Sequence, residues 1–146
     1  MKTIIAIDPD LHKSGVAVYQ KYRSVDSLVC VSSCNMWELF DFIKAWTISS
    51  MGNSDKDIVV LLEYPDNTNT YHKGGKGAAL NVGKNQAVAI IIKEFLDAIG
   101  VNYKLLKPKG YSNYFKDKEF FKRQTGWVEQ TNNDSRAAAA MIWLNK

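Results

Sequence analysis

The stretch Thr3–Asp10, TIIAIDPD, decides the fold. Its first five residues form a continuous β-prone apolar run, and Pro9 cannot donate a hydrogen bond to a central ladder, so we expect the strand to end at Asp8. Polar turns separate this run from two further β-prone segments, Val16–Tyr19 and Leu28–Val31. Three strands joined by short turns predict an antiparallel meander at the start of the chain.

The following segments predict a crossover to parallel strands. Asn35 can cap a helix with one apolar stripe facing the sheet. The run Ile58–Leu62 is too uniformly apolar for a strand with one wet face, which implies a central strand parallel to the first. A helix from about Ala79 should end at the C-cap Gly100, before a fifth strand, Val101–Leu106. The expected stripes are Trp37, Phe40, Ile43 and Trp46 in the first helix and Val88, Ile91, Ile92, Phe95 and Ile99 in the second.

Three acids stand at the ends of predicted elements. Asp8 and Glu63 end the first and fourth strands, and Asp134 opens an alanine-rich final helix. Paired strands lie about 4.8 Å apart, so the strand acids converge if their strands pair, and a helix can supply the third. Packed carboxylates repel unless a cation intervenes, and Mg²⁺ or Mn²⁺ prefers hard oxygen ligands. The trio therefore predicts a metal site suited to phosphodiester cleavage. Taken singly, each acid has a common alternative explanation as a turn former or a helix N-cap, and the order of the elements that carry the three acids is more specific than any one of them.

Basic residues concentrate in one window of the chain. The chain carries a net charge of +4, and the window from Asn102 to Gly126 alone holds seven bases and two acids. Such a segment can contact the phosphates of a nucleic acid, although most charge runs are simply solvated surfaces. The candidate contacts in this window are Lys116, Lys118, Lys122 and Arg123.

A long polar segment, Tyr64–Ala78, reads as an exposed loop, and its length for a compact domain suggests a function. Tyr71 and His72 could stack on unpaired bases, and the alternative is a flexible loop without such a role. The lysines expected to hold nearby phosphates are Lys73, Lys76 and Lys84.

Length and composition bound the remaining possibilities. The 146 residues, 46% hydrophobic, predict one domain spanning residues 1–146. The longest apolar run, Ala87–Ile92, is far shorter than the roughly 20 residues of a membrane span. Asp8 interrupts any signal-peptide core, so a cytoplasmic location is the default. Cys30 and Cys34 are expected to be reduced thiols, because the two separated histidines supply a zinc site poorly.

The run Ile7–Ala17, IDPDLHKSGVA, resembles the opening motif of RuvC-like Holliday-junction resolvases: Ile-Asp-Pro-Gly, four residues, then Gly. Glu63 falls where that family has its second acid, and the length matches along nearly the whole chain. The resemblance implies an α/β, ribonuclease H-like fold. Its five-stranded mixed sheet would hold three antiparallel strands and then two parallel ones, with helices on both faces.

The same resemblance implies a Mg²⁺-dependent endonuclease that cleaves branched DNA, of the four-way-junction type, with Mn²⁺ able to substitute. Asp8, Glu63 and Asp134 would hold the metal, and a metal-activated water would attack the phosphodiester in line. Lysines in the basic region assist cleavage in that family, which makes Lys116 and Lys118 the candidates here. The resemblance also implies a homodimer, for which the exposed faces of the helix Ala79–Ile99 are the expected interface.

Two departures from the family pattern leave a second hypothesis open. Asp10 replaces the usual turn glycine, which Asp tolerates because it can adopt left-handed conformations. Ala137 stands where the final helix usually carries a further acid, one turn after Asp134. The chain is therefore either a three-carboxylate nuclease or an inactive protein that binds junctions or single-stranded DNA. A sugar-kinase or actin-like ATPase is disfavoured, because it needs two copies of this fold and 146 residues cannot supply both.

Overall fold

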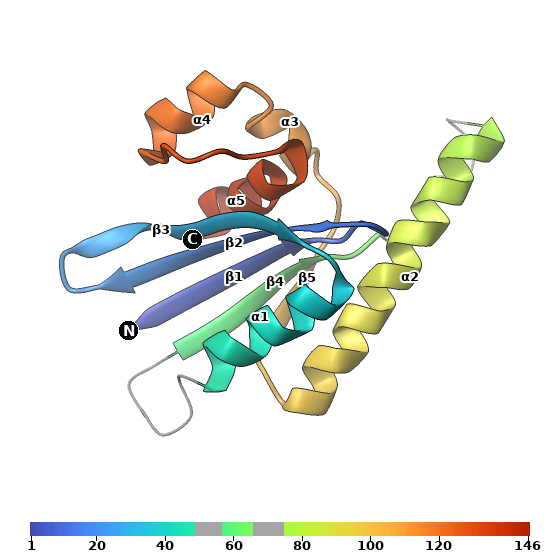
Figure 1. The fold of residues 1–146 in the computed structure, drawn as a ribbon, viewed down its shortest axis with the longest axis horizontal. Coiled ribbons are helices and arrows are strands. Elements are labelled where there is room, and N and C mark those ends of the chain that lie inside the picture. Colours follow the sequence, from blue (N-terminus) through green and yellow to red (C-terminus); the bar gives the residue numbers. More distant parts are fainter. Residues whose placement is uncertain (49–56, 66–74) are drawn as a thin grey trace.

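The computed structural model describes residues 1–48, 57–65 and 75–146, which form a five-stranded sheet with helices on both faces (Figure 1). The strands are β1 (Lys2–Asp8), β2 (Ser14–Tyr22), β3 (Val25–Cys34), β4 (Asp57–Glu63) and β5 (Tyr103–Leu106). The helices are α1 (Met36–Ile48), α2 (Gly75–Ile99), α3 (Tyr111–Tyr114), α4 (Lys118–Thr125) and α5 (Asn133–Asn145).

The strand order across the sheet is β3-β2-β1-β4-β5. The first three strands pair antiparallel, whereas β4 runs parallel to both β1 and β5. The predicted meander and the predicted crossover to a parallel strand are both confirmed. The uniformly apolar sequence of β4 follows from its place inside the sheet, between β1 and β5 and beneath helices on both faces.

Side-chain alternation along the strands divides the core into two layers. On one face, Ile5 and Ile7 pack with the residues of α1 and α2. On the other face, Ile4 and Ala6 pack with α5 and with aromatic residues of α3 and α4. Asp8 continues the even-numbered series of β1, so its side chain belongs to the α5 face of the sheet.

The apolar stripe predicted for α1 is correct at Ile43, which is buried, and at Phe40 and Trp46, which pack against the same core, but it is wrong at Trp37. The residues that α1 buries are Leu39 and Ile43, one turn apart, and Trp37 is 77% exposed. Successive residues of an α-helix are about 100° apart, so Trp37 lies about 200° around the helix from Leu39. Leu39 packs against the sheet, and Trp37 points away from it. Trp37 therefore belongs to the surface and not to the core.

Two boundaries and one buried position also differ from the predictions. α2 begins at Gly75, because helix formation is cooperative and extends through the glycines that indicated a loop to Ala78. β5 begins at Tyr103, two residues after the expected start. Ile91 is 47% exposed, since the contact with the sheet is made by a row of residues at four-residue spacing. That row is Val88, Ile92 and Leu96.

Two further features concern the described residues as a whole. Cys30 and Cys34 are free thiols, as expected. In the described ranges, none of the helices combines the length and the apolar character that a bilayer crossing requires.

Candidate metal and nucleic-acid site

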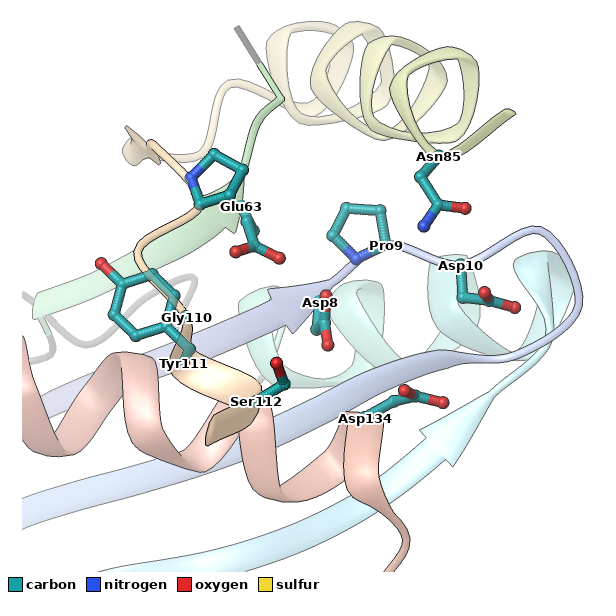
Figure 2. A pocket seen from close by; sticks show the side chains of 10 residues that line it. Asp8, Pro9, Asp10, Glu63, Asn85, Gly110, Tyr111, Ser112 and Asp134 are labelled. Atoms are coloured by element: carbon teal, nitrogen blue, oxygen red, sulfur yellow. The ribbon is translucent and has the colours of Figure 1, made fainter. Parts of the chain in front are cut away.

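A polar pocket with a volume of about 360 Å³ lies where the strands β1 and β4 end. In mixed and parallel sheets, ligands bind beyond the carboxyl ends of the strands, and this pocket has that position. The start of α3, the first turn of α5 and one residue of α2 complete its walls (Figure 2). Its lining residues are Asp8, Pro9, Asp10, Glu63, Asn85, Pro108, Gly110, Tyr111, Ser112 and Asp134.

The two strand acids meet directly. Ile7 pairs with Leu62, so Asp8 and Glu63 stand side by side at the ends of adjacent parallel strands and on the same face of the sheet. Their carboxyl groups point toward one another in Figure 2 and share a side-chain hydrogen bond. Burial, that hydrogen bond and the charges of Glu63, Asp134 and Asp10 raise the pKa of Asp8 to about 9. The pair thus holds a proton where a cation would otherwise compensate the charge.

Asp134 reaches the same pocket from the first turn of α5, and it is not the helix cap. Asn132 is the N-cap, because its side chain accepts a 2.8 Å hydrogen bond from the Ser135 backbone N–H, and Ser135 completes a capping box. The alternative explanation of Asp134 as a structural cap is therefore wrong. Burial and the charge of Asp10 raise the pKa of Asp134, and Figure 2 shows its carboxylate pointing along the pocket rim instead of toward Glu63.

Asp10 occupies the turn after β1 with an ordinary backbone. Its φ is not positive, so the left-handed conformation considered for this position is not used. Its Oδ1 instead accepts hydrogen bonds from the backbone N–H groups of His12 and Lys13, an Asx turn that needs no glycine. Asp10 adds a fourth acid to the pocket lining, as expected from its position beside Asp8.

The donor set is the kind that hard divalent cations prefer, since the pocket offers carboxylates, an amide and a hydroxyl. As placed, however, the described residues contain no group of three or more His, Cys, Asp or Glu side chains that could hold one ion together. Asp8 and Glu63 place two carboxyl groups side by side at one edge of this pocket. Asp134 lines the same pocket, with its carboxylate directed away from Glu63 (Figure 2).

Ala137 does not belong to the pocket. It is 2% exposed and lies in the core layer between α5 and the sheet. The side chain of an acid at position 137 would begin inside this packed layer, one helical turn after Asp134.

The pocket contains residues that sequence reasoning missed. Ser112 lies in α3, in the connection that leaves the end of β5. The rule that strand ends gather at one edge of a sheet could have placed this connection at the pocket. The Ser112 hydroxyl lies on the Asp8 side of the pocket in Figure 2. Asn85 projects from α2 toward Pro9 and Asp10, and no pattern in the sequence indicates that contact, because it depends on how α2 packs.

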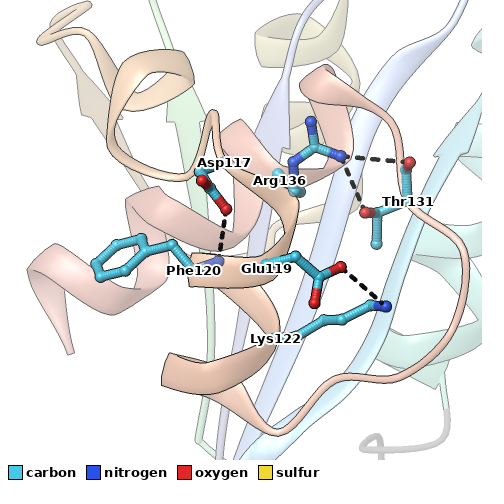
Figure 3. Close-up of polar contacts among 6 residues, drawn as sticks. All are labelled: Asp117, Glu119, Phe120, Lys122, Thr131 and Arg136. Atoms are coloured by element: carbon cyan, nitrogen blue, oxygen red, sulfur yellow. Dashed lines mark hydrogen bonds and ion pairs between the residues drawn. The ribbon is translucent and has the colours of Figure 1, made fainter.

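The basic segment, which is the part of the window Asn102–Gly126 that follows β5, forms α3 and α4. These two helices cover one face of α5. Phe115 and Phe121 are fully buried against α5, so the aromatic and basic residues do separate onto two sides, as expected. Lys116, Lys118 and Arg123 are exposed. Lys122 is half-buried and makes a 3.3 Å ion pair with Glu119 (Figure 3).

Arg136 ties this segment to α5. Its side chain is 6% exposed and donates hydrogen bonds to the carbonyl oxygens of Phe115 and Lys116. It also donates to both oxygens of Thr131 (Figure 3). Because Arg136 lies two residues after Asp134, the basic segment and the helix-borne acid are held by the same turn of α5.

The remaining predicted nucleic-acid contacts are only partly described. Lys84 is exposed on α2. Lys76 lies in the first turns of α2, and its side chain is outside the described part. Tyr71 and Lys73 fall in the range 66–74, also outside the described residues.

No protein-family model and no curated protein matches the chain. Among solved structures, the chain is similar to RuvC of T. thermophilus in complex with a Holliday junction substrate, with a TM-score of 0.51 and 15% identity over 99% of this chain and 96% of that one. It is also similar to the fowlpox virus Holliday junction resolvase, with a TM-score of 0.55 and 13% identity over 97% of this chain and 96% of that one. At these identities the likeness establishes the ribonuclease H-like fold.

Proposed function

We propose that this chain is a single-domain, metal-dependent endonuclease that cuts branched DNA of the four-way-junction type. The observation that carries the proposal is the pocket itself, in which acids from β1, β4 and α5 gather next to a basic segment. Two of these acids face each other across adjacent strands and retain a proton in the absence of a cation. The two similar structures are a RuvC bound to a Holliday junction substrate and a viral Holliday junction resolvase, which supports this choice of substrate.

In this proposal Asp8 and Glu63 hold the metal, and Asp134 completes the ligand set from α5. A Mg²⁺ ion, or Mn²⁺ in its place, would stabilise negative charge on the phosphate and acidify a coordinated water for in-line attack. Asp10 adds negative charge at the rim, which strengthens the attraction for a divalent cation.

The basic segment would dock the DNA backbone. Lys116 and Lys118 are exposed on the same side of the sheet as the pocket, and the contacts of Arg136 hold them at a set place relative to Asp134. Phosphate contacts of this kind orient a substrate without reading its sequence. Further contacts are proposed from Lys122, Arg123 and Lys84, and from Tyr71, Lys73 and Lys76 in the segment before α2 and in its first turns.

The test is cleavage of a synthetic four-way junction in Mg²⁺ or Mn²⁺. Asp8→Asn should lower the cleavage rate by about 10³-fold or more, since a metal ligand supports several kcal/mol of transition-state stabilisation and each 1.4 kcal/mol is tenfold. Junction affinity in a gel-shift assay should stay unchanged. Asp26→Asn, which neutralises an exposed acid near Lys21, is the matched control and should cut normally.

A second candidate function is binding of junctions or single-stranded DNA without cleavage. The position of Ala137 in the core and the orientation of the Asp134 carboxylate along the rim favour it. Under this alternative the wild-type protein shifts the junction in a gel, forms no products in either metal, and is indifferent to Asp8→Asn. That combination would replace the nuclease proposal.

A homodimer is proposed through α2, because Ile90 and Ile91 and, nearer its start, Leu80 are exposed on this helix. Sedimentation at micromolar concentration should show a dimer that Ile91→Glu dissociates. Leu105→Glu on β5, where the leucine has a similar exposed fraction of 42%, is the control and should leave the dimer intact. A monomeric wild-type chain contradicts this part of the proposal.

A further inference from the structure

Three residues form one row across the sheet directly beneath the start of α5. Gly15 of β2 pairs with Asp8 of β1 on one side and with Ser33 of β3 on the other. Directly opposed residues in neighbouring strands present their side chains on the same face. The row Asp8, Gly15, Ser33 therefore faces α5 as a unit, with an acid at one end and a hydroxyl at the other.

The middle of the row is in contact with the backbone of Asp134. A β-carbon added to Gly15 would lie 2.1 Å from the carbonyl oxygen of Asp134, 2.2 Å from its carbonyl carbon and 2.7 Å from the Ser135 nitrogen. All three atoms are backbone atoms, so no side-chain rotation can relieve the overlap. Gly15 does not have a positive φ, and its requirement for glycine is one of space alone.

The far end of the row holds the residue that caps the same helix. The Ser33 Oγ accepts a 3.1 Å hydrogen bond from the side-chain Nδ2 of Asn132, whose Oδ1 caps α5. The first turn of α5 is thus attached to the sheet at two adjacent points of one row. The third point of the row is Asp8, which lines the same pocket as Asp134.

We propose that Gly15 and Ser33 are positioning residues that set where Asp134 stands relative to Asp8, so that the two acids can act on one divalent cation. The inference rests on the proposed function for the identity of the ligand. It assigns to a residue without a side chain, and to a hydroxyl outside the pocket lining, the placement of the acid that comes from the helix. Neither residue would contact the metal or the DNA.

Gly15→Ala tests the proposal, with Gly83→Ala as its control. A β-carbon on Gly83, an exposed residue of α2, would meet nothing within 4 Å. Circular dichroism first establishes that each variant is folded at the assay temperature. In Gly15→Ala, Mn²⁺ affinity measured by electron paramagnetic resonance should fall by about tenfold or more, the usual effect of disturbing the support of a metal ligand. Gel-shift affinity for the metal-free junction should be unchanged, and Gly83→Ala should match the wild type in both measurements.

A second readout reports placement directly and does not depend on metal. Backbone amide shifts and hydrogen exchange at Ser135 and Arg136 should change in Gly15→Ala and not in Gly83→Ala. A variant that is merely less stable, with α5 seated normally, would retain Mn²⁺ affinity and these amide shifts while folded. That result would overturn the positioning role.

If Gly15→Ala does not fold, Ser33→Ala decides, because it removes only an exposed hydrogen bond from the same row. We expect a severalfold loss of Mn²⁺ affinity, with Ser32→Ala as the neighbouring control that points to the other face. Unchanged affinity in Ser33→Ala would then overturn the proposal. A wild-type protein that binds no Mn²⁺ at all would instead overturn the proposed function, and the role of the row with it.

Discussion

The helices on the two faces of the sheet contact it through side chains of different size. The face under α1 and α2 is filled by long aliphatic residues such as Leu39, Ile92 and Leu96. The face under α5 meets the helix through the run Ala137–Ala140 and, at the end of the sheet, through Gly15. Small residues let a helix backbone approach a strand, whereas large ones keep it at the distance that their side chains fill.

This difference bears on the acidic pocket. The close approach of α5 places backbone atoms of its first turn against β2 and brings Asp134 to the ends of β1 and β4. On the opposite face, α1 and α2 pack long apolar side chains against the sheet, and among their described residues only Asn85 lines the acidic pocket. Buried apolar side chains support both faces, and the α5 face also brings a helix-borne acid to the pocket.

The largest expected effects on stability come from changing the size of a buried side chain on each face of the sheet. Ile92→Ala should cost about 2–5 kcal/mol of unfolding free energy, because it leaves a cavity. Ala138→Leu should cost about 1–3 kcal/mol by overpacking. Only Ala138→Leu should also lower junction cleavage per folded molecule, since it lifts α5 from the sheet. Urea unfolding and cleavage assays check this pair, and equal losses of cleavage in both variants would remove the distinction between the faces.

The unfolding free energy of the metal-free protein should depend on pH through Asp8, whose side chain lies on the α5 face. The pKa of Asp8 is about 9 in the folded chain against an ordinary value of 3.8, so the folded state binds more protons than the unfolded state between these pH values. The unfolding free energy of the metal-free protein should therefore decrease as pH rises through this window. In EDTA, calorimetry should show Asp8→Asn gaining in Tm over the wild type from pH 5 to pH 9. A gain that does not depend on pH, or an equal one in Asp26→Asn, would contradict this origin.

The two helix caps offer a matched comparison of smaller size. Asn35 caps α1 through the backbone N–H groups of Trp37 and Glu38, and Asn132 caps α5. Each change to Ala should cost about 1 kcal/mol of unfolding free energy. Only Asn132→Ala should lower Mn²⁺ affinity, because only α5 carries an acid of the pocket. The same loss of affinity in Asn35→Ala would indicate that the effect comes from general stability.

The smallest expected effect concerns DNA binding. Replacing both Lys116 and Lys118 by Ala should reduce the slope of log affinity against log salt by about 0.9 for each lost phosphate contact. Lys44→Ala on α1, on the opposite face, should leave the slope unchanged. Titrations at several salt concentrations check this, and an equal reduction in Lys44→Ala would place the DNA elsewhere on the molecule.

Much of the fold was predictable because its signals are local. The end of β1 at Asp8, the central position of β4 and the order of antiparallel and parallel strands follow from apolar runs, a proline and a crossover helix. The burial of Leu39 and the exposure of Trp37 in α1 were not predictable, because several apolar residues lie around that helix and only packing selects which of them are buried. Trp37 is the clearest example.

For the site, the sequence alone determined which acids stand at the ends of strands and that a basic segment precedes the last helix. Only the tertiary structure decided that Asp8 contacts Glu63, that Asn132 caps α5 in place of Asp134, and that Gly15 lies beneath the peptide of Asp134. The physical reason is that strand ends are marked by local chemistry. The approach of a helix to a sheet depends instead on the sizes of residues that are far apart in the chain and meet only when it folds.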